Sequence, residues 1–131
     1  MILSYIIFNI LSGEVMRIIT CPANMIDLQL ASGEDYIEGT VDDDSLVYIV
    51  NGSIQNRPYQ QTTLSNTLVI ANGIDYVVLQ SLPITCAVSV KETAYNVTDG
   101  VLEVSFDTVG TYRITITAFP YLDKTFTVEA I

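Results

Sequence analysis

The sequence predicts an all-β protein with one minor helix: a small N-terminal β-hairpin subdomain followed by a two-sheet β-sandwich. Two observations favour this class. Apolar and polar residues alternate with a period of two through the C-terminal half, as they do in half-buried antiparallel strands. Short turn-forming pairs built from Gly, Pro, Asn and Asp separate these stretches, which is typical of sandwiches with many short strands.

The N-terminal subdomain begins with an apolar, β-branched stretch at residues 5–10, followed by a Ser12-Gly13 turn and a second stretch at 15–20. This pattern predicts a hairpin. The stretch that opens the chain lacks a basic region and a small-residue cleavage site, so it does not resemble a signal peptide, and it is too short to span a bilayer. We therefore expect a buried strand there.

A short helix is predicted over residues 22–30, because Pro22 suits the first helical position. Met25, Leu28 and Ile26 are its candidate inward-facing side chains. A strand at 36–41 follows.

Strands at 46–50 and 53–57 are joined by Asn51-Gly52, the pair favoured by a two-residue turn with positive φ at both positions. Pro58 ends the second of these strands because it has no N–H to give to a ladder.

The chain is divided by a polar, uncharged segment. We expect a β-rich subdomain at residues 1–58, a linker at 59–67 and a sandwich at 68–131. Seven strands are predicted in the sandwich, at residues 68–71, 76–79, 85–90, 95–97, 101–106, 111–118 and 124–130. The alternation is clearest at 111–118, where every second residue is apolar or aromatic.

One group of residues favours an immunoglobulin-like sandwich, although it has one more residue between Asp and Gly than the pattern of that family. Asp107 and Gly110 precede Tyr112 at the start of a long strand. They resemble the corner of immunoglobulin-like domains, in which a tyrosine hydroxyl bonds back to the upstream backbone. The second cysteine of that family would fall at Ile114, so the inter-sheet disulfide is missing. Cys86 lies in an alternating stretch and is expected to be buried and free, although a pairing with Cys21 stays open.

Charge and hydropathy bear on the partners. Fifteen acidic residues against five basic ones give a formal charge of −10, which disfavours nucleic acid and anionic membrane, because both are bound through Lys and Arg. Half of the residues are hydrophobic and the mean hydropathy is +0.42. So much apolar surface must be hidden in a core or by a partner, and we expect contacts with other subunits.

The residues offer little for catalysis. The chain has no histidine, which removes the commonest general base and metal ligand, and it has no CxxC pair and no glycine-rich phosphate loop. The run Asp42-Asp43-Asp44 is the one carboxylate cluster. It is interpreted as a solvated turn, with a calcium-binding turn helped by Ser45 and Glu38 as the alternative. We therefore expect no enzyme activity, no metal and no cofactor.

The chain resembles small tailed-bacteriophage proteins associated with tail fibres. In its first half the resemblance rests on residues 13–22, 33–34, 36–39 and 48–52, and in its second half on 82–83, 97–100, 110–113 and 118–123. It implies a structural protein of the virion, made in the bacterial cytoplasm and acting as an adaptor or accessory subunit of the tail or its fibres. A head decoration protein and an assembly chaperone that is absent from the virion remain alternatives.

Two segments are candidate interfaces. The expected loop Phe119, Pro120, Tyr121 and Leu122 places two aromatic residues at a tip of the sandwich, where aromatics often anchor a partner. In the alternative, they fold back onto their own domain. Tyr5 and Ile7 belong to the N-terminal strand, which is apolar on both faces and is expected to be covered on both sides.

Overall fold

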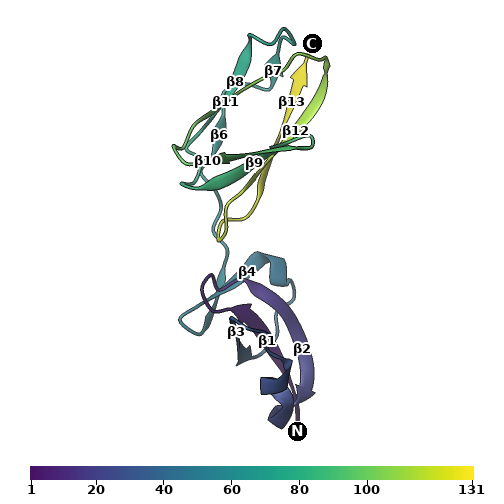
Figure 1. Cartoon of the computed structure of the whole chain (residues 1–131), viewed down its shortest axis with the longest axis vertical. Coiled ribbons are helices and arrows are strands. Elements are labelled where there is room, and N and C mark those ends of the chain that lie inside the picture. Colours follow the sequence, from purple (N-terminus) through teal and green to yellow (C-terminus); the bar gives the residue numbers. More distant parts are fainter. The chain divides into compact units, whose positions relative to one another are not determined.

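Strands make up 52 % of the chain and helical segments 8 %, which confirms the predicted all-β class. The computed structural model describes all residues from Met1 to Ile131. They form two units, Met1–Pro58 and Tyr59–Ile131 (Figure 1).

The first unit is built on an antiparallel sheet in the order β2-β1-β3, with β1 at Ile2–Asn9, β2 at Val15–Pro22 and β3 at Glu34–Glu38. β1 is the central strand of this sheet and pairs with a neighbour at each edge. Three successive side chains on it are buried, namely Tyr5, Ile6 and Ile7. Tyr5 and Ile7 pack with Ile26 in a small core.

The predicted helix is a 3-10 segment, η1, at Ala23–Gln29, and Pro22 occupies its N-cap. Of the three candidate inward side chains only Ile26 is buried, and Met25 and Leu28 are exposed. A 3-10 helix has three residues per turn, so Met25 and Leu28 share a face on which Ile26 does not lie. The expectation that they face inward is therefore wrong.

A hairpin completes the first unit. Its strands are β4 at Val47–Val50 and β5 at Ser53–Asn56, and the short 3-10 segment η2 at Asp44–Leu46 precedes them. Both Asn51 and Gly52 have positive φ, as the predicted turn requires. The N–H of Ile49 donates to the Gly13 carbonyl at 2.8 Å, which ties the hairpin to the β1–β2 turn.

The second unit is an immunoglobulin-like sandwich of two sheets, in the orders β10-β9-β12-β13-β7 and β11-β8-β6 (Figure 1). The strands are β6 at Thr63–Leu64, β7 at Leu68–Val69, β8 at Tyr76–Gln80, β9 at Cys86–Val90, β10 at Thr93–Val97, β11 at Leu102–Ser105, β12 at Gly110–Thr117 and β13 at Lys124–Ala130. All seven predicted strands are present, with ends that differ by a few residues. Only β7 pairs in parallel, with β13.

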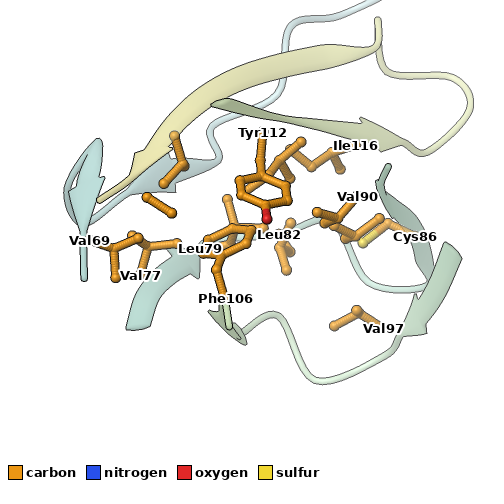
Figure 2. Close-up of a cluster of buried hydrophobic side chains, with 14 of the residues drawn as sticks. Val69, Val77, Leu79, Leu82, Cys86, Val90, Val97, Phe106, Tyr112 and Ile116 are labelled. Carbon is orange, nitrogen blue, oxygen red and sulfur yellow. The ribbon is translucent and has the colours of Figure 1, made fainter. Parts of the chain in front are cut away.

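The core of the sandwich lies between the two sheets (Figure 2). The alternation in β12 predicted its inward face correctly, because Tyr112, Ile114, Ile116 and Ala118 are all buried. The Tyr112 hydroxyl donates to the Thr108 carbonyl at 2.6 Å, which confirms the tyrosine corner. Both cysteines are free, with Cys86 buried and Cys21 half-buried.

The segment at 59–67 is part of the second unit and not a separate linker. Gln60 and Thr62 are buried, and the Gln60 side-chain amide donates to the carbonyls of Ile116 and Leu122, each at 2.9 Å. Thr62 in turn donates to the Gln60 side-chain oxygen at 3.0 Å. The polar composition that predicted a linker instead satisfies buried backbone carbonyls.

Candidate interaction surfaces

Tyr5 and Ile7, predicted at an interface, lie inside the first unit. Tyr5 is 4 % exposed and Ile7 is fully buried. The ring of Tyr5 packs edge-on against Tyr36 at 5.4 Å between centroids, and burial raises the pKa of its hydroxyl. The apolar character of this strand is therefore explained by packing within its own unit, and these two residues offer no surface to a partner.

The predicted docking loop, Phe119 to Leu122, connects β12 to β13. All four of its side chains are half-buried, and Tyr121 packs against the sandwich core. The Tyr121 N–H donates to the Ala118 carbonyl at 2.8 Å, and the Leu122 carbonyl accepts the bond from Gln60. For Tyr121 these contacts favour the alternative in which the loop folds back onto its own domain.

The acidic run at Asp42–Asp44 forms a capped turn at the start of η2. One Asp43 oxygen accepts from the Ser45 hydroxyl at 2.6 Å and from the Ser45 N–H at 3.0 Å. These bonds, the hydroxyl first, hold the pKa of Asp43 below its ordinary value. Within residues 1–131, no three His, Cys, Asp or Glu side chains are grouped so that they could hold a metal ion.

The outer face of the five-stranded sheet is polar along β12 and β13. Register pairs Thr111 with Glu129, Arg113 with Thr127 and Thr115 with Thr125. These six residues alternate with the buried ones, so they lie on the outer face. Antiparallel sheets commonly have one face packed on the core and the other exposed to solvent in this way.

At one end of this face the polar pattern stops. The N–H of Ile131 donates to the Val69 carbonyl, and the N–H of Ala71 donates to the Ile131 carbonyl, so the β7–β13 ladder continues and sets Ile70 beside Ile131. Extending the β12–β13 register by one residue past Gly110 and Ala130 sets Val109 opposite Ile131. These three side chains therefore form one aliphatic row across neighbouring strands, and each is 55–70 % exposed.

Two further exposed aliphatic residues lie close to Ile70 in the sequence. Leu68 lies two residues before Ile70 on the same face of β7. Ile74 lies in the β7–β8 loop, where the carboxylate of Asp75 accepts from the N–H of Ile70 at 2.9 Å and so closes the loop. We call the set Leu68, Ile70, Ile74, Val109 and Ile131 the apolar end patch. The patch was not predicted from the sequence, although Ile70 and Ile74 on either side of the Asn72-Gly73 turn were a signal for it.

The first unit also presents an apolar feature, at the β1–β2 turn. Ile10 and Leu11 are exposed, Leu11 almost completely at 97 %. The Asn9 side-chain oxygen accepts from the N–H groups of Leu11 and Ser12, at 2.9 and 3.0 Å, which holds the turn in one conformation. We call Ile10 and Leu11 the apolar turn.

Neither helical segment has the length and apolar character of a membrane-crossing helix. No protein-family model matches the chain, and no curated protein matches it in sequence. Among solved structures, the chain is similar to a glycosyl hydrolase family 2 member from Bacteroides cellulosilyticus, with 12 % identity and a TM-score of 0.42. That match covers 98 % of this chain and 21 % of the hydrolase, so the chain spans about a fifth of that protein's length.

Proposed function

We propose that this chain is a non-enzymatic structural subunit that joins other proteins through apolar contacts made separately by its two units. The observation that carries the proposal is the apolar end patch. Single exposed apolar residues are normal on a protein surface, whereas contiguous ones mark interaction sites. The row Ile70, Ile131 and Val109, with Leu68 on the same face, meets that criterion, and Ile74 adds an exposed isoleucine in the adjacent β7–β8 loop.

The free energy gained by burying these aliphatic side chains supports a partner on this patch. Burying one fully exposed aliphatic side chain contributes about 1.5–3 kcal/mol. The patch residues are between half and four-fifths exposed, so a partner that covers them gains about half to four-fifths of that amount at each position. The apolar turn supplies a second, smaller contact of the same kind on the first unit.

The proposed setting is the virion of a tailed bacteriophage, and it rests on the resemblance described above. In that setting the partners are other virion proteins, the subunit is oligomeric in the particle, and its place is the tail or the tail fibres. A capsid decoration protein would use the same patch against capsid subunits. An assembly chaperone would use it transiently and leave before the particle is complete.

The test replaces two patch residues and measures incorporation into particles. Ile74→Ser combined with Val109→Ser should leave the melting temperature nearly unchanged, because both side chains are exposed, and should remove the chain from purified particles. The matched control is Ile84→Ser, which changes an equally exposed isoleucine, 83 % against 81 % for Ile74, in the β8–β9 loop. This control should be incorporated normally.

Three outcomes contradict parts of the proposal. Normal incorporation of the folded double variant would show that the patch is not the docking site. Absence of the wild-type chain from particles that need it for assembly would favour the chaperone. Density for the chain on the capsid in particle images would favour the decoration protein over the tail subunit.

A further inference from the structure

The strand β11 has a neighbour on one side only, because it ends the sheet order β11-β8-β6. The direction of its free backbone groups follows from the other side of β8. Val78 bonds toward β6: its N–H donates to the Ser65 hydroxyl at 2.8 Å, and its carbonyl accepts from the Ser65 N–H at 2.9 Å. Backbone groups alternate in direction along a strand, so those of Val77 and Leu79 point toward β11.

The register then identifies the free groups of β11. Val77 pairs with Val104 and Leu79 with Leu102, so the backbone groups of these two β11 residues are used by β8. The N–H and C=O groups of the alternate residues, Glu103 and Ser105, therefore point to the open edge. The carbonyl of Phe106 fits this alternation, because it accepts from the N–H of Gly73 on the β8 side.

A groove of about 170 Å³ runs beside this edge, lined by Tyr95, Leu102, Glu103, Val104 and Ser105. Tyr95 belongs to β10 and pairs with Val88, which is fully buried, so the tyrosine lies on the inner side of its sheet. Tyr95 is nevertheless 46 % exposed. The groove between the edge strands β10 and β11 is therefore lined by the ring of Tyr95 and by the half-buried side chains of Leu102 and Val104.

The charge along this edge has one sign. From Glu92 to Tyr112 the chain carries four acidic residues, Glu92, Asp99, Glu103 and Asp107, and no Lys or Arg. Of these four, Glu103 lies on β11 and lines the groove, so a segment that pairs with β11 passes beside its carboxylate. A basic segment is attracted there, and a second copy of this chain, with its formal charge of −10, is repelled.

We propose that β11 is a strand-addition site for an extended segment of a partner protein in which Lys or Arg alternates with aliphatic residues. The segment pairs with the backbone groups of Glu103 and Ser105, its aliphatic side chains enter the groove beside Tyr95, and its basic side chains lie near Glu103 on the outer face. Main-chain bonds supply the affinity in this mode, and the alternate side chains supply the specificity. The inference rests on the proposed protein-binding function and names a second surface for it, apart from the apolar end patch.

The test uses the full chain and a synthetic, end-blocked peptide of about eight residues in which lysine and valine alternate, a length typical of natural strands. Binding is followed by NMR shifts and by amide exchange. The peptide should shift the β11 signals, slow the exchange of the Glu103 and Ser105 amides, and bind less well as salt rises. Two control peptides should bind at least about tenfold more weakly. A lysine peptide N-methylated on alternate residues loses inter-strand bonds, each of which costs severalfold. A peptide with glutamate in place of lysine is repelled by the acidic edge.

Three variants separate main-chain pairing from side-chain contact. Ser105→Pro removes a free-edge N–H that β8 does not use, a position where edge strands accept proline, and it should abolish peptide binding without unfolding the sandwich. Ser105→Ala keeps the N–H and should bind as the wild type does. Glu103→Gln should weaken binding severalfold and reduce its salt dependence.

Each other outcome overturns the inference. Shifts that map to β6, β7 or the first unit would place the peptide elsewhere. Equal binding of the acidic and basic peptides would remove the charge argument. A dimer of the chain that is lost in Ser105→Pro would show that a second copy occupies the edge. These measurements use purified protein and peptide, so they are independent of the particle experiment. The peptide can fail to bind β11 while the apolar end patch still directs incorporation into particles. Equally, the peptide can bind β11 in a chain whose patch has no role in incorporation.

Discussion

Removing the corner hydroxyl with Tyr112→Phe isolates one bond that holds the sandwich together. The hydroxyl donates at 2.6 Å to the carbonyl of Thr108, and the ring packs on Phe106 with 4.3 Å between centroids (Figure 2). Phenylalanine keeps the ring contact and loses only the hydrogen bond. A buried carbonyl left unpaired costs about 1–3 kcal/mol, but Thr108 is exposed and water can reach it, so we expect about 1–2 kcal/mol.

For a unit of this size, 1 kcal/mol corresponds to about 4–8 °C in melting temperature, so the loss should be about 5–15 °C. The assay is thermal unfolding of the full chain followed by methyl NMR signals of the second unit, which scores the two units separately. Tyr76→Phe is the matched control, because Tyr76 is 48 % exposed on the outer side of β8. If both variants melt with the wild type, the hydroxyl bond does not stabilise the corner.

Three more substitutions test the first unit. Gly13→Ala should destabilise it by about 2–4 kcal/mol in urea unfolding, since φ is +78° and a Cβ there would collide with the Ile49 carbonyl. Gly33→Ala, with φ of +81° and open space around the Cβ, should cost only about 1–2 kcal/mol, and equal costs would contradict the collision. A hydrogen bond from Arg17 holds the pKa of Glu34 below its ordinary value of 4.5. The stability from this pair is therefore present above pH 4.5 and lost as the pH falls through the lowered pKa, and Glu34→Gln should flatten that acid-side loss in urea titrations, whereas an unchanged slope would refute the assignment.

The sequence predicted the structure best where the conformation depends on residues that are close together in the chain. The period-two pattern in β12 and β13 and the Asn51-Gly52 turn follow from backbone geometry alone, and both were predicted with the correct facing or turn type. The tyrosine corner was readable because Asp107, Gly110 and Tyr112 are close in sequence. In each case the deciding interactions lie within a few residues of one another.

Long-range packing decided what the sequence analysis missed. Gln60 looked like a linker residue because its partners, the Ile116 and Leu122 carbonyls, are distant in sequence. Tyr5 and Ile7 looked available to a partner because nothing local shows that β1 is the central strand of its sheet. The apolar end patch is assembled from distant segments, so no single stretch displays it.

The outer face of the five-stranded sheet is polar along most of β12 and β13 and aliphatic at one end. This difference supports the proposed role of the apolar end patch in binding a partner. Local rules of patterning are usually broken where function requires it. Along β12 and β13 the outer positions hold threonine, arginine and glutamate until the last row, where Val109 and Ile131 follow and Ile70 lies beside Ile131. Chance would scatter exposed aliphatic residues over the face, whereas these three come from separate segments and lie side by side. A polar residue at any of these positions would serve the isolated sandwich as well, because the core on the other side of the sheet is unaffected. The stability of the unit does not require the aliphatic row, and this supports the proposed role in binding a partner.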